Sequence, residues 1–453
     1  MLTIPEQIYG VSAIWSEAKY NFVFWNQRES LDWDAEYQKT LQNVMKPMAL
    51  LDYYLELSRF ISLLNDGHTY VDYPKEVRSG FLTLPIKIQY TQGKHIITNT
   101  AEGCEIPLFS EILAIGGMDF DRYMKEKILP YCWNKKLTSS YKKLYAFSQL
   151  TGEGDKNAYT YIPIIEKNQS ITLSTTNGEY RIKPVTRDAK WSLPGILTGK
   201  NKLKEIFRSE GLTISLTEDQ IAVLTLPTFM DNDMPSNFYR HLASLKSCKG
   251  FIIDVRGNGG GNSCNADMFT QAFIRGKFEI GKVKHAVHIG AYKAWGNGKD
   301  FSQWNMKNSF NKKIYDVCKQ NLFEEEITSA HYPDCPLTLE QPIVILEDAA
   351  TGSSSENMLM AFLNANRATI VGMPSYGSTG NPLILSLPGG GMARICTRRY
   401  TFPNDKEFIN IGIEPHIYAD ISQKDMTEGR DSVLDQGIEI LRQNCEKSKT
   451  ALF

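Results

Sequence analysis

Three consecutive serines could supply a nucleophile in this chain. They lie in "EDAATGSSSENMLMAFLNAN", residues 347–366, where an acidic loop turns into a run of helical apolar periodicity. A serine hydroxyl attacks a carbonyl carbon when a neighbouring base takes its proton. Serines at such a place also suit a helix cap, and Glu356 stands in a capping-box position relative to Ser353. The stretch alone favours the cap, so the surrounding sequence must decide.

A glycine-rich loop, "DVRGNGGGN" at residues 254–262, is the second candidate. It fails the GxGxxG pattern, because Asn262 stands where a glycine is required, and no GKS or GKT follows it, so a nucleotide site is disfavoured. Exposed backbone amides also suit an oxyanion hole, which needs donors about 3 Å from a developing negative oxygen. If Ser353 attacked a carbonyl, the Ser354 N–H and an amide of this loop could be those donors. No glycine stands two residues after Ser353, which excludes the G-x-S-x-G elbow.

Alternating strands and helices must position both loops. From about 186 to 445 the pattern predicts strands at "QIAVLTL", "GFIIDV", "PIVILE" and "ATIVG", with helices between them. This order predicts a mainly parallel sheet covered by helices, and both loops follow buried strands, where such folds place their sites. The lysine- and aromatic-rich stretch from about 276 to 340 interrupts the order and predicts an inserted lid or surface excursion.

The residues before this region predict two further parts. Residues 1–78 are expected to be helical. One amphipathic helix is predicted from the apolar stripe Tyr54, Leu57, Ile61 and Leu64, and Gly67 is expected to end that helix. His68 follows at once, and "HTYVDYP" predicts a short strand ended by proline. Residues 79–185 predict short strands, among them a hairpin at Asn177 and Gly178, with a helix-like run "FDRYMKEKILPY".

Composition excludes several classes of protein. With 50 basic and 51 acidic residues the net charge is −1, so no nucleic-acid footprint is expected. No apolar run reaches the roughly 18 residues of a membrane helix, and the N-terminus lacks a signal-peptide pattern. The eight cysteines show no CxxC spacing and no neighbouring histidine pair, so a zinc site is unsupported.

Four motifs in order carry a family resemblance: "GFIIDVRGNGGG", "PIVILEDAATGSSSE", "IVGMPSYGSTG" and "GIEPHI". Together they resemble the tail-specific (C-terminal processing) and tricorn family of serine peptidases, over roughly 200 residues. Upstream, "FLTLPIKIQY" with "SEILAIGG" is similar to the PDZ-like domain of many members, and "LNDGHTYVDYP" to a segment of the tricorn-like helical domain. The resemblance implies an α/β, crotonase-like (ClpP/crotonase) catalytic domain at 186–453, after a PDZ-like domain at 79–185 and a helical domain at 1–78.

The resemblance also implies roles for residues. The nucleophile lies three positions before the motif's glutamate, which selects Ser353. The oxyanion donors would be the N–H groups of Ser354 and Gly260, with Gly259 as the near alternative. The tail-specific branch has a lysine base where this chain has Ser378, which leaves Ser378 a possible substrate contact.

A base must therefore come from elsewhere, or the site is inactive. The tricorn-like branch takes a histidine from the preceding domain, which selects His68, although that branch has a serine where this chain has Gly67. A helix C-terminus would favour the imidazolium that forms when a base accepts a proton. Without the resemblance a structural histidine is the favoured interpretation. Glu414 in "GIEPHI" is the expected third member, with a surface salt bridge as the alternative.

The function that follows is hydrolysis of peptide bonds in unfolded or C-terminal polypeptide segments, without metal or organic cofactor. Gly80 and Phe81 could form the loop of the PDZ-like domain that holds a peptide end, although a plain strand entry fits equally. The alternative is an inactive protein that binds peptides or apolar ligands; an acyl-CoA enzyme is disfavoured. The resemblance suggests the periplasm or cell envelope, with a leader missing from the sequence; otherwise a cytoplasmic protein is expected.

Overall fold

The N-terminal part of the chain is helical in the computed structural model, which describes residues 1–79, 82–128, 170–186, 189–191, 199–333 and 338–450. Its helices are α1 (Ile4–Asn21), α2 (Trp33–Val44) and α3 (Leu50–Ile61), with single 3-10 turns at Trp25–Gln27 and Ser62–Leu64. The capping box of Thr3 and Glu6 starts α1, and the Asp32 carboxylate caps α2. The predicted apolar stripe on α3 and its following turn is confirmed, because all four side chains are buried.

The end of this helical segment differs from the prediction. The chain leaves the turn at Asn65, whose φ of 55° lies in the left-handed region, and not at Gly67. Asparagine adopts this conformation more readily than most residues. Arg28 holds the turn, because its guanidinium donates to the carbonyl oxygens of Leu64 (2.7 Å) and Asn65 (3.0 Å). His68 therefore lies beyond the last helical turn, where the helix dipole no longer acts strongly.

A seven-stranded sheet confirms the predicted alternation of strands and helices. Its order is β10 (Lys204–Arg208), β11 (Thr213–Leu216), β12 (Ile221–Thr225), β13 (Gly250–Asp254), β16 (Ile343–Glu347), β17 (Thr369–Gly372) and β21 (Ile417–Tyr418). Strands β12 to β21 run parallel, and β10 and β11 form an antiparallel edge. The carboxyl ends of β13 and β16, which carry the two candidate loops, therefore lie side by side.

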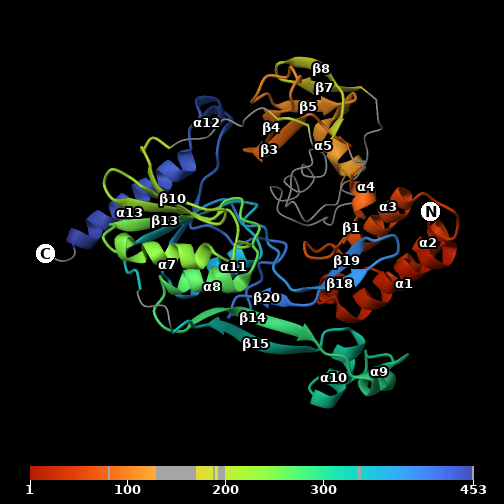
Figure 1. The fold of residues 1–453 in the computed structure, drawn as a ribbon. Coiled ribbons are helices and arrows are strands. Elements are labelled where there is room, and N and C mark those ends of the chain that lie inside the picture. The colour runs from red at the N-terminus through yellow and green to blue at the C-terminus, as the bar shows by residue number, and fades with distance from the viewer. Residues whose placement is uncertain (80–81, 129–169, 187–188, 192–198, 334–337, 451–453) are drawn as a thin grey trace.

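Helices cover both faces of this sheet (Figure 1). On one face α7 (Met234–Leu245), α8 (Ser263–Gln271) and α11 (Ser354–Asn364) pack with Ile253 and Ile345. On the other, α12 (Gln423–Glu428) and α13 (Ser432–Thr450) pack with Ile252 and Val344. Successive strand residues alternate between the two cores, as a sheet buried on both faces requires.

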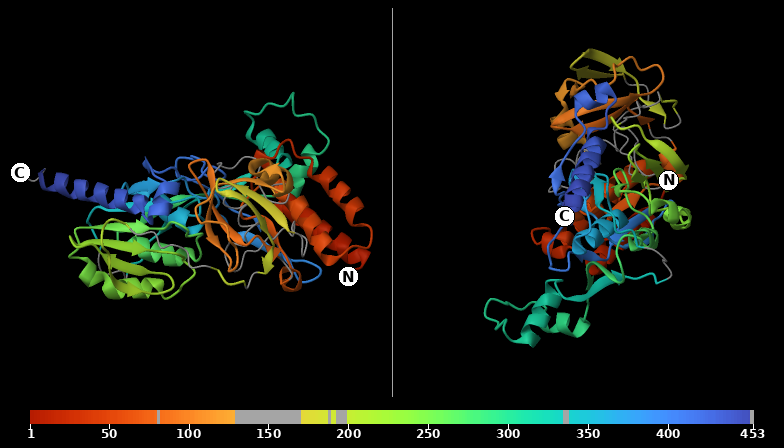
Figure 2. Two further views of the ribbon diagram at one scale, coloured as in Figure 1. Left: turned by 90° about the horizontal axis from the view of Figure 1, so that it is seen from above. Right: turned by 90° about the vertical axis from the view of Figure 1, so that its left-hand side faces the viewer.

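The interruption of the alternation forms a long hairpin arm. Strands β14 (Phe278–Ala286) and β15 (Phe323–Ala330) pair with each other, β20 (Arg399–Thr401) joins β14, and α9 (Gly290–Gly296) and α10 (Ser309–Cys318) lie at the tip. Figures 1 and 2 show the tip projecting away from the seven-stranded sheet. The arm touches α1, because His288 Nε2 lies 2.7 Å from the carbonyl oxygen of Tyr20.

Short strands with their own core make up the part between residues 82 and 186. The pairs are β2 (Leu82–Thr83) with β9 (Val185–Thr186), β3 (Ile86–Thr91) with β4 (Lys94–Thr100), and the order β6 (Met118–Asp119), β5 (Ile112–Ile115), β7 (Ile171–Thr175), β8 (Gly178–Ile182). The hairpin at Asn177 and Gly178 is confirmed. The expected helix is α5 (Phe120–Tyr123) followed by a π turn, Met124–Ile128. Its last three predicted residues, and Gly80 and Phe81, lie outside the described residues.

One small sheet joins the segment after the N-terminal helices to residues 382–396. The predicted short strand, β1 (Tyr70–Asp72), is followed by α4 (Lys75–Arg78), and β1 pairs with β19 (Met392–Cys396), which pairs with β18 (Pro382–Ser386). This pairing brings His68, just before β1, close to Ser378, just before β18. Among the helices in the described ranges, none is long and apolar enough to cross a membrane.

Candidate active site

Ser353 differs from the two serines that follow it. It stands between β16 and α11 with φ 54° and ψ −119°, a conformation that a residue with a Cβ rarely adopts, and it is partly exposed. Ser354 and Ser355 are buried, and their hydroxyls donate to the carbonyl oxygens of Gly261 (2.7 Å) and Asn258 (3.0 Å). Strained backbone that a fold maintains is frequent at functional sites. Of the three serines, Ser353 is the one whose side chain is accessible.

The cap interpretation is also partly correct. The Ser353 N–H donates to Glu356 Oε2 at 3.2 Å, and the Glu356 N–H donates to the Ser353 carbonyl oxygen at 2.9 Å. The backbone of residue 353 thus starts α11 in the way a helix start requires. Capping and a chemical role are therefore compatible at this residue.

The Glu356 carboxylate also holds the loop after β17. It accepts from the hydroxyls of Ser375 (2.7 Å) and Thr379 (2.8 Å) and from the N–H groups of Gly377 (2.5 Å) and Ser378 (3.1 Å). Burial raises the pKa of Glu356, and the hydrogen bonds from Ser375 and Thr379 oppose that rise. Because all four of these groups donate to it, the carboxylate fixes residues 375–379 against the first turn of α11.

The loop before β1 places His68 against this same segment. The Asp66 carboxylate accepts from the His68 N–H (3.1 Å) and the Thr69 hydroxyl (2.6 Å), and Thr69 Oγ1 accepts from the Cys396 N–H on β19 (2.9 Å). So anchored, His68 Nδ1 lies 2.6 Å from Ser378 Oγ. The Ser353 N–H donates to the Ser378 carbonyl oxygen at 3.1 Å. Ser378 is therefore in contact with both His68 and Ser353.

The electrostatic environment of His68 differs from the expectation. We expected a helix terminus to favour the imidazolium, but desolvation, and then the nearby Arg394 guanidinium, lower the pKa of His68 to about 4. At neutral pH the ring is uncharged. A neutral imidazole has a lone pair with which to accept a proton, as a general base must.

The glycine loop lies directly against Ser353. Gly260 has φ 99°, and a Cβ there would lie 2.6 Å from Ser353 Cβ and 2.9 Å from the Ser354 nitrogen, so a larger residue does not fit. Its N–H donates to Asn258 Oδ1 at 2.9 Å, so it would have to leave that acceptor before it could bind an oxyanion. The neighbouring residue, Gly259, is exposed. The loop thus borders the candidate nucleophile, as predicted, with the Gly260 amide already engaged.

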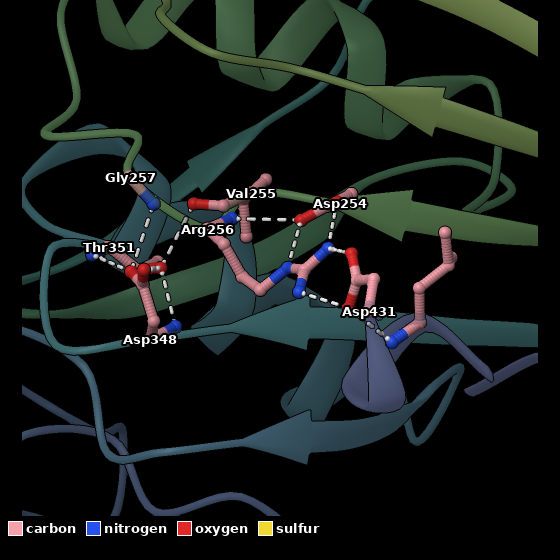
Figure 3. A network of polar contacts seen from close by, with 8 residues as sticks. Asp254, Val255, Arg256, Gly257, Asp348, Thr351 and Asp431 are labelled. Carbon is pink, nitrogen blue, oxygen red and sulfur yellow. Dashed lines mark hydrogen bonds and ion pairs between the residues drawn. The ribbon is translucent and has the colours of Figure 1, made fainter. Parts of the chain in front are cut away.

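A buried ion-pair network fixes the start of the glycine loop (Figure 3). The Arg256 guanidinium donates to Asp254 on β13 and to both carboxylate oxygens of Asp431 at the start of α13 (2.9 and 2.7 Å). These carboxylates raise the pKa of Arg256 against the effect of its burial. Beside it, Asp348 Oδ1 accepts the Gly257 N–H at 2.9 Å. Loop, sheet and C-terminal helix are so joined by charge-assisted hydrogen bonds.

Of the other predicted site residues, Ser378 lies at this centre and Glu414 does not. Glu414 is exposed, and its carboxylate accepts from the Tyr418 hydroxyl; no described contact joins it to His68. Ser378, expected as a substrate contact, bonds the His68 ring. Gly80 and Phe81 fall outside the described residues. Within the described ranges, no group of three or more His, Cys, Asp or Glu side chains is placed to hold a metal ion.

Sequence reasoning missed the anchoring residues of both loops. The Asp66 and Thr69 contacts follow from a D-x-x-T spacing, which is a recognisable turn signal. Ser375 and Thr379 carried no such local signal, because their acceptor lies about 20 residues earlier in the chain.

The loops that follow β16 and β17 are joined by hydrogen bonds at the carboxyl ends of parallel strands. They bring the accessible Ser353 next to Ser378, which contacts the neutral His68. This arrangement defines a candidate serine-hydrolase site. Residues 220–419 match the model of peptidase family S41, a family of serine-type peptidases.

Curated relatives are similar to part of this chain, and a solved structure has a similar fold. The chain is 27% identical over 188 residues to the carboxy-terminal-processing protease of Bartonella bacilliformis, a match over 42% of this chain and 35% of that protein. It is 29% identical over 102 residues to the carboxyl-terminal-processing protease of a Picosynechococcus species, over 22% of this chain and 23% of that protein. The matched stretch thus spans about a third or less of these relatives. Mature CPAF in complex with lactacystin has a similar fold, with a TM-score of 0.70, 15% identity and 98% of each chain covered.

Proposed function

We propose that this protein hydrolyses peptide bonds by acyl transfer, with Ser353 as the nucleophile and His68 as the general base. The observation that carries the proposal is the position of Ser378, which contacts His68 through its hydroxyl and Ser353 through its carbonyl oxygen. Ser378 therefore connects the His68 ring to the backbone of Ser353. The match of residues 220–419 to the model of peptidase family S41 supports the same roles.

The proposed reaction has two halves. Ser353 Oγ attacks the peptide carbonyl carbon while His68 Nε2 takes the hydroxyl proton, and a tetrahedral intermediate forms. The imidazolium then gives that proton to the leaving nitrogen, the C–N bond breaks and an acyl-enzyme remains. In the second half His68 takes a proton from water, which attacks the ester, and the acid leaves as Ser353 recovers its proton.

Backbone amides would stabilise the negative oxygen. The Ser354 N–H, at the start of α11, and an amide of the glycine loop border Ser353. For Gly260 to contribute, its N–H must leave Asn258 Oδ1 when substrate binds. Gly259 remains the alternative donor.

We extend the proposal to the substrate and the domains. The names of the two curated relatives describe processing of carboxyl termini, and we propose unfolded or C-terminal polypeptide segments as substrate here. The proposed domains are a helical part at 1–78, a PDZ-like part at 79–185 and a crotonase-like part at 186–453. The separate apolar core of residues 84–182 supports an independent module in the middle.

One observation favours a second candidate, a peptide-binding protein without turnover. The Gly260 N–H is engaged by Asn258, which leaves the oxyanion site incomplete as described. Such a protein would bind peptides whether or not Ser353 carries a hydroxyl.

The test is cleavage of an unstructured protein, read by mass spectrometry of newly formed chain ends. The unmutated chain, Ser353→Ala and His68→Ala are compared. Ser354→Ala is not a suitable control, because the Ser354 hydroxyl has a structural hydrogen bond. Ser386→Ala is the matched control, since this serine is exposed on β18. We expect new ends from the unmutated chain and the control alone. Equal cleavage by Ser353→Ala would reject the proposal, and binding without cleavage would favour the second candidate.

A further inference from the structure

Ser378 is held by two contacts of its backbone and one of its side chain. Its N–H donates to Glu356 Oε2 at 3.1 Å, its carbonyl oxygen accepts the Ser353 N–H at 3.1 Å, and its Oγ lies 2.6 Å from His68 Nδ1. Ser378 is 2% exposed, so bulk water has little access to its contact with the ring nitrogen. A short hydrogen bond between fixed partners defines the orientation of an imidazole ring.

The residue before His68 provides an independent observation. Gly67 does not have a positive φ, so its backbone conformation does not require glycine. Instead, a Cβ at this position would lie 2.6 Å from Ser378 Oγ and 2.8 Å from Ser378 Cβ. The Ser378 hydroxyl thus occupies the space that a side chain at position 67 would need, and Gly67 is small because Ser378 is there.

We propose that Ser378 is the positioning residue of His68. Its Oγ accepts a hydrogen bond from the Nδ1–H group, so that the Nε2 lone pair is free to take the Ser353 proton. This inference rests on the proposed function for its catalytic meaning. A neutral imidazole carries one proton, and the partner of one ring nitrogen decides which nitrogen holds it. In this chain that partner is a hydroxyl from the loop after β17.

A neutral partner fits the electrostatics of the site. A carboxylate next to Nδ1 would stabilise the imidazolium and raise the histidine pKa, whereas a hydroxyl offers no charge. The pKa of His68 is in fact lowered to about 4. His68 therefore stays neutral at pH 7, and the position of its single proton can be measured directly.

The first experiment reads this proton without any turnover. Nitrogen-15 NMR of histidine-labelled protein at pH 7 distinguishes a protonated Nδ1 from a protonated Nε2, and His68→Phe assigns the resonance. We expect the Nδ1–H form in the unmutated chain and a shift towards the Nε2–H form in Ser378→Ala. A protonated Nε2 in the unmutated chain, or no change in Ser378→Ala, would overturn the inference.

The second experiment separates positioning from substrate binding. We expect Ser378→Ala to lower kcat by about 10- to 100-fold, the cost of a misplaced catalytic group, with KM changed less than about threefold. Ser386→Ala is again the control and should keep both constants. An unchanged kcat in a folded Ser378→Ala protein would count against the inference.

A relocated hydroxyl provides the sharpest variant. In Ser378→Gly the space beside Gly67 is vacated, and adding Gly67→Ser places a side chain with a hydroxyl in that same space. We expect the double variant to recover at least about tenfold in kcat over Ser378→Gly, and to restore the Nδ1–H signal. Failure of both recoveries in a folded double variant would contradict the role.

The two proposals fail in different ways. If no variant cleaves polypeptide, yet the Nδ1 proton of the unmutated chain depends on Ser378, the positioning role holds and the proposed peptidase function fails. If cleavage depends on Ser353 and His68 but not on Ser378, the peptidase function holds and this inference fails.

Discussion

The Ser353 N–H donates to the carbonyl oxygen of Ser378 at 3.1 Å, which joins the loop after β16 to the loop after β17. The hydroxyl of Ser378 also contacts His68, so this bond places the strained Ser353 next to the residue that holds the His68 ring. The pairing of β1 with β19 brings His68 there from more than 300 residues away in the chain. The proposed site therefore depends on the small three-stranded sheet as much as on the large one.

The backbone of Ser353 predicts a conflict between stability and activity. Its φ of 54° and ψ of −119° are costly for a residue with a Cβ and acceptable for glycine. Ser353→Gly should therefore be more stable than Ser353→Ala by about 1 kcal/mol, although both lack the hydroxyl. Urea unfolding measures the difference, and a more stable alanine variant would argue against strain at this position.

Glu356 should be essential for the fold around the site. It accepts hydrogen bonds from Ser375, Gly377, Ser378 and Thr379 in a buried place, and a glutamine amide would turn a donor towards these donors. We expect Glu356→Gln to lower the free energy of unfolding by about 2–4 kcal/mol.

Loss of activity should accompany that change, because the loop with Ser378 would no longer be fixed. Glu428→Gln is the control, because Glu428 is exposed and forms a surface ion pair, with 3.7 Å between its carboxylate and Lys424 Nζ. Its effect should stay within about 0.5 kcal/mol. Equal denaturation midpoints for the two variants would show that the Glu356 network contributes little.

Glu347 should make stability depend on pH. Burial, and then the nearby carboxylate of Glu356, raise the pKa of Glu347 well above its ordinary value. Neither of its carboxylate oxygens has a hydrogen-bond partner among the described residues. The folded state thus holds this proton more tightly than the unfolded state, so stability is fully present below the unfolded pKa of about 4.3 and is lost as pH rises towards the folded pKa.

Replacing the carboxyl removes that loss. We expect Glu347→Gln to match the unmutated chain near pH 4 and to exceed it in free energy of unfolding by an amount that grows above pH 5, about 1.4 kcal/mol for each unit of raised pKa. Urea titrations at several pH values measure this. A difference that does not change with pH would mean that Glu347 titrates normally.

Much of the fold followed from local pattern. The buried strands "GFIIDV" and "PIVILE", the helix after Ser353 and the hairpin at Asn177 and Gly178 each carry their own periodicity or turn signal. The nucleophile loop and the glycine loop could be placed together, because loops at the carboxyl ends of adjacent parallel strands must meet.

Contacts between distant segments could not be predicted in this way. The spacing of residues in the sequence does not predict that Ser378 contacts His68. It also does not predict that the Ser378 side chain leaves no room for a side chain at position 67. The expected helix stop at Gly67 was wrong because an asparagine adopted the left-handed conformation two residues earlier. The pKa of His68 depends on desolvation by the assembled loops, which local pattern does not report.

The most direct test of Ser353 as an activated nucleophile is covalent labelling with diisopropyl fluorophosphate. The intact mass is measured for the unmutated chain, Ser353→Ala, His68→Ala and Ser386→Ala, and a digest locates the adduct. The account predicts one adduct on Ser353, none in Ser353→Ala, much slower labelling in His68→Ala and normal labelling in Ser386→Ala. An adduct on another residue, or equal labelling of Ser353 without His68, would contradict it.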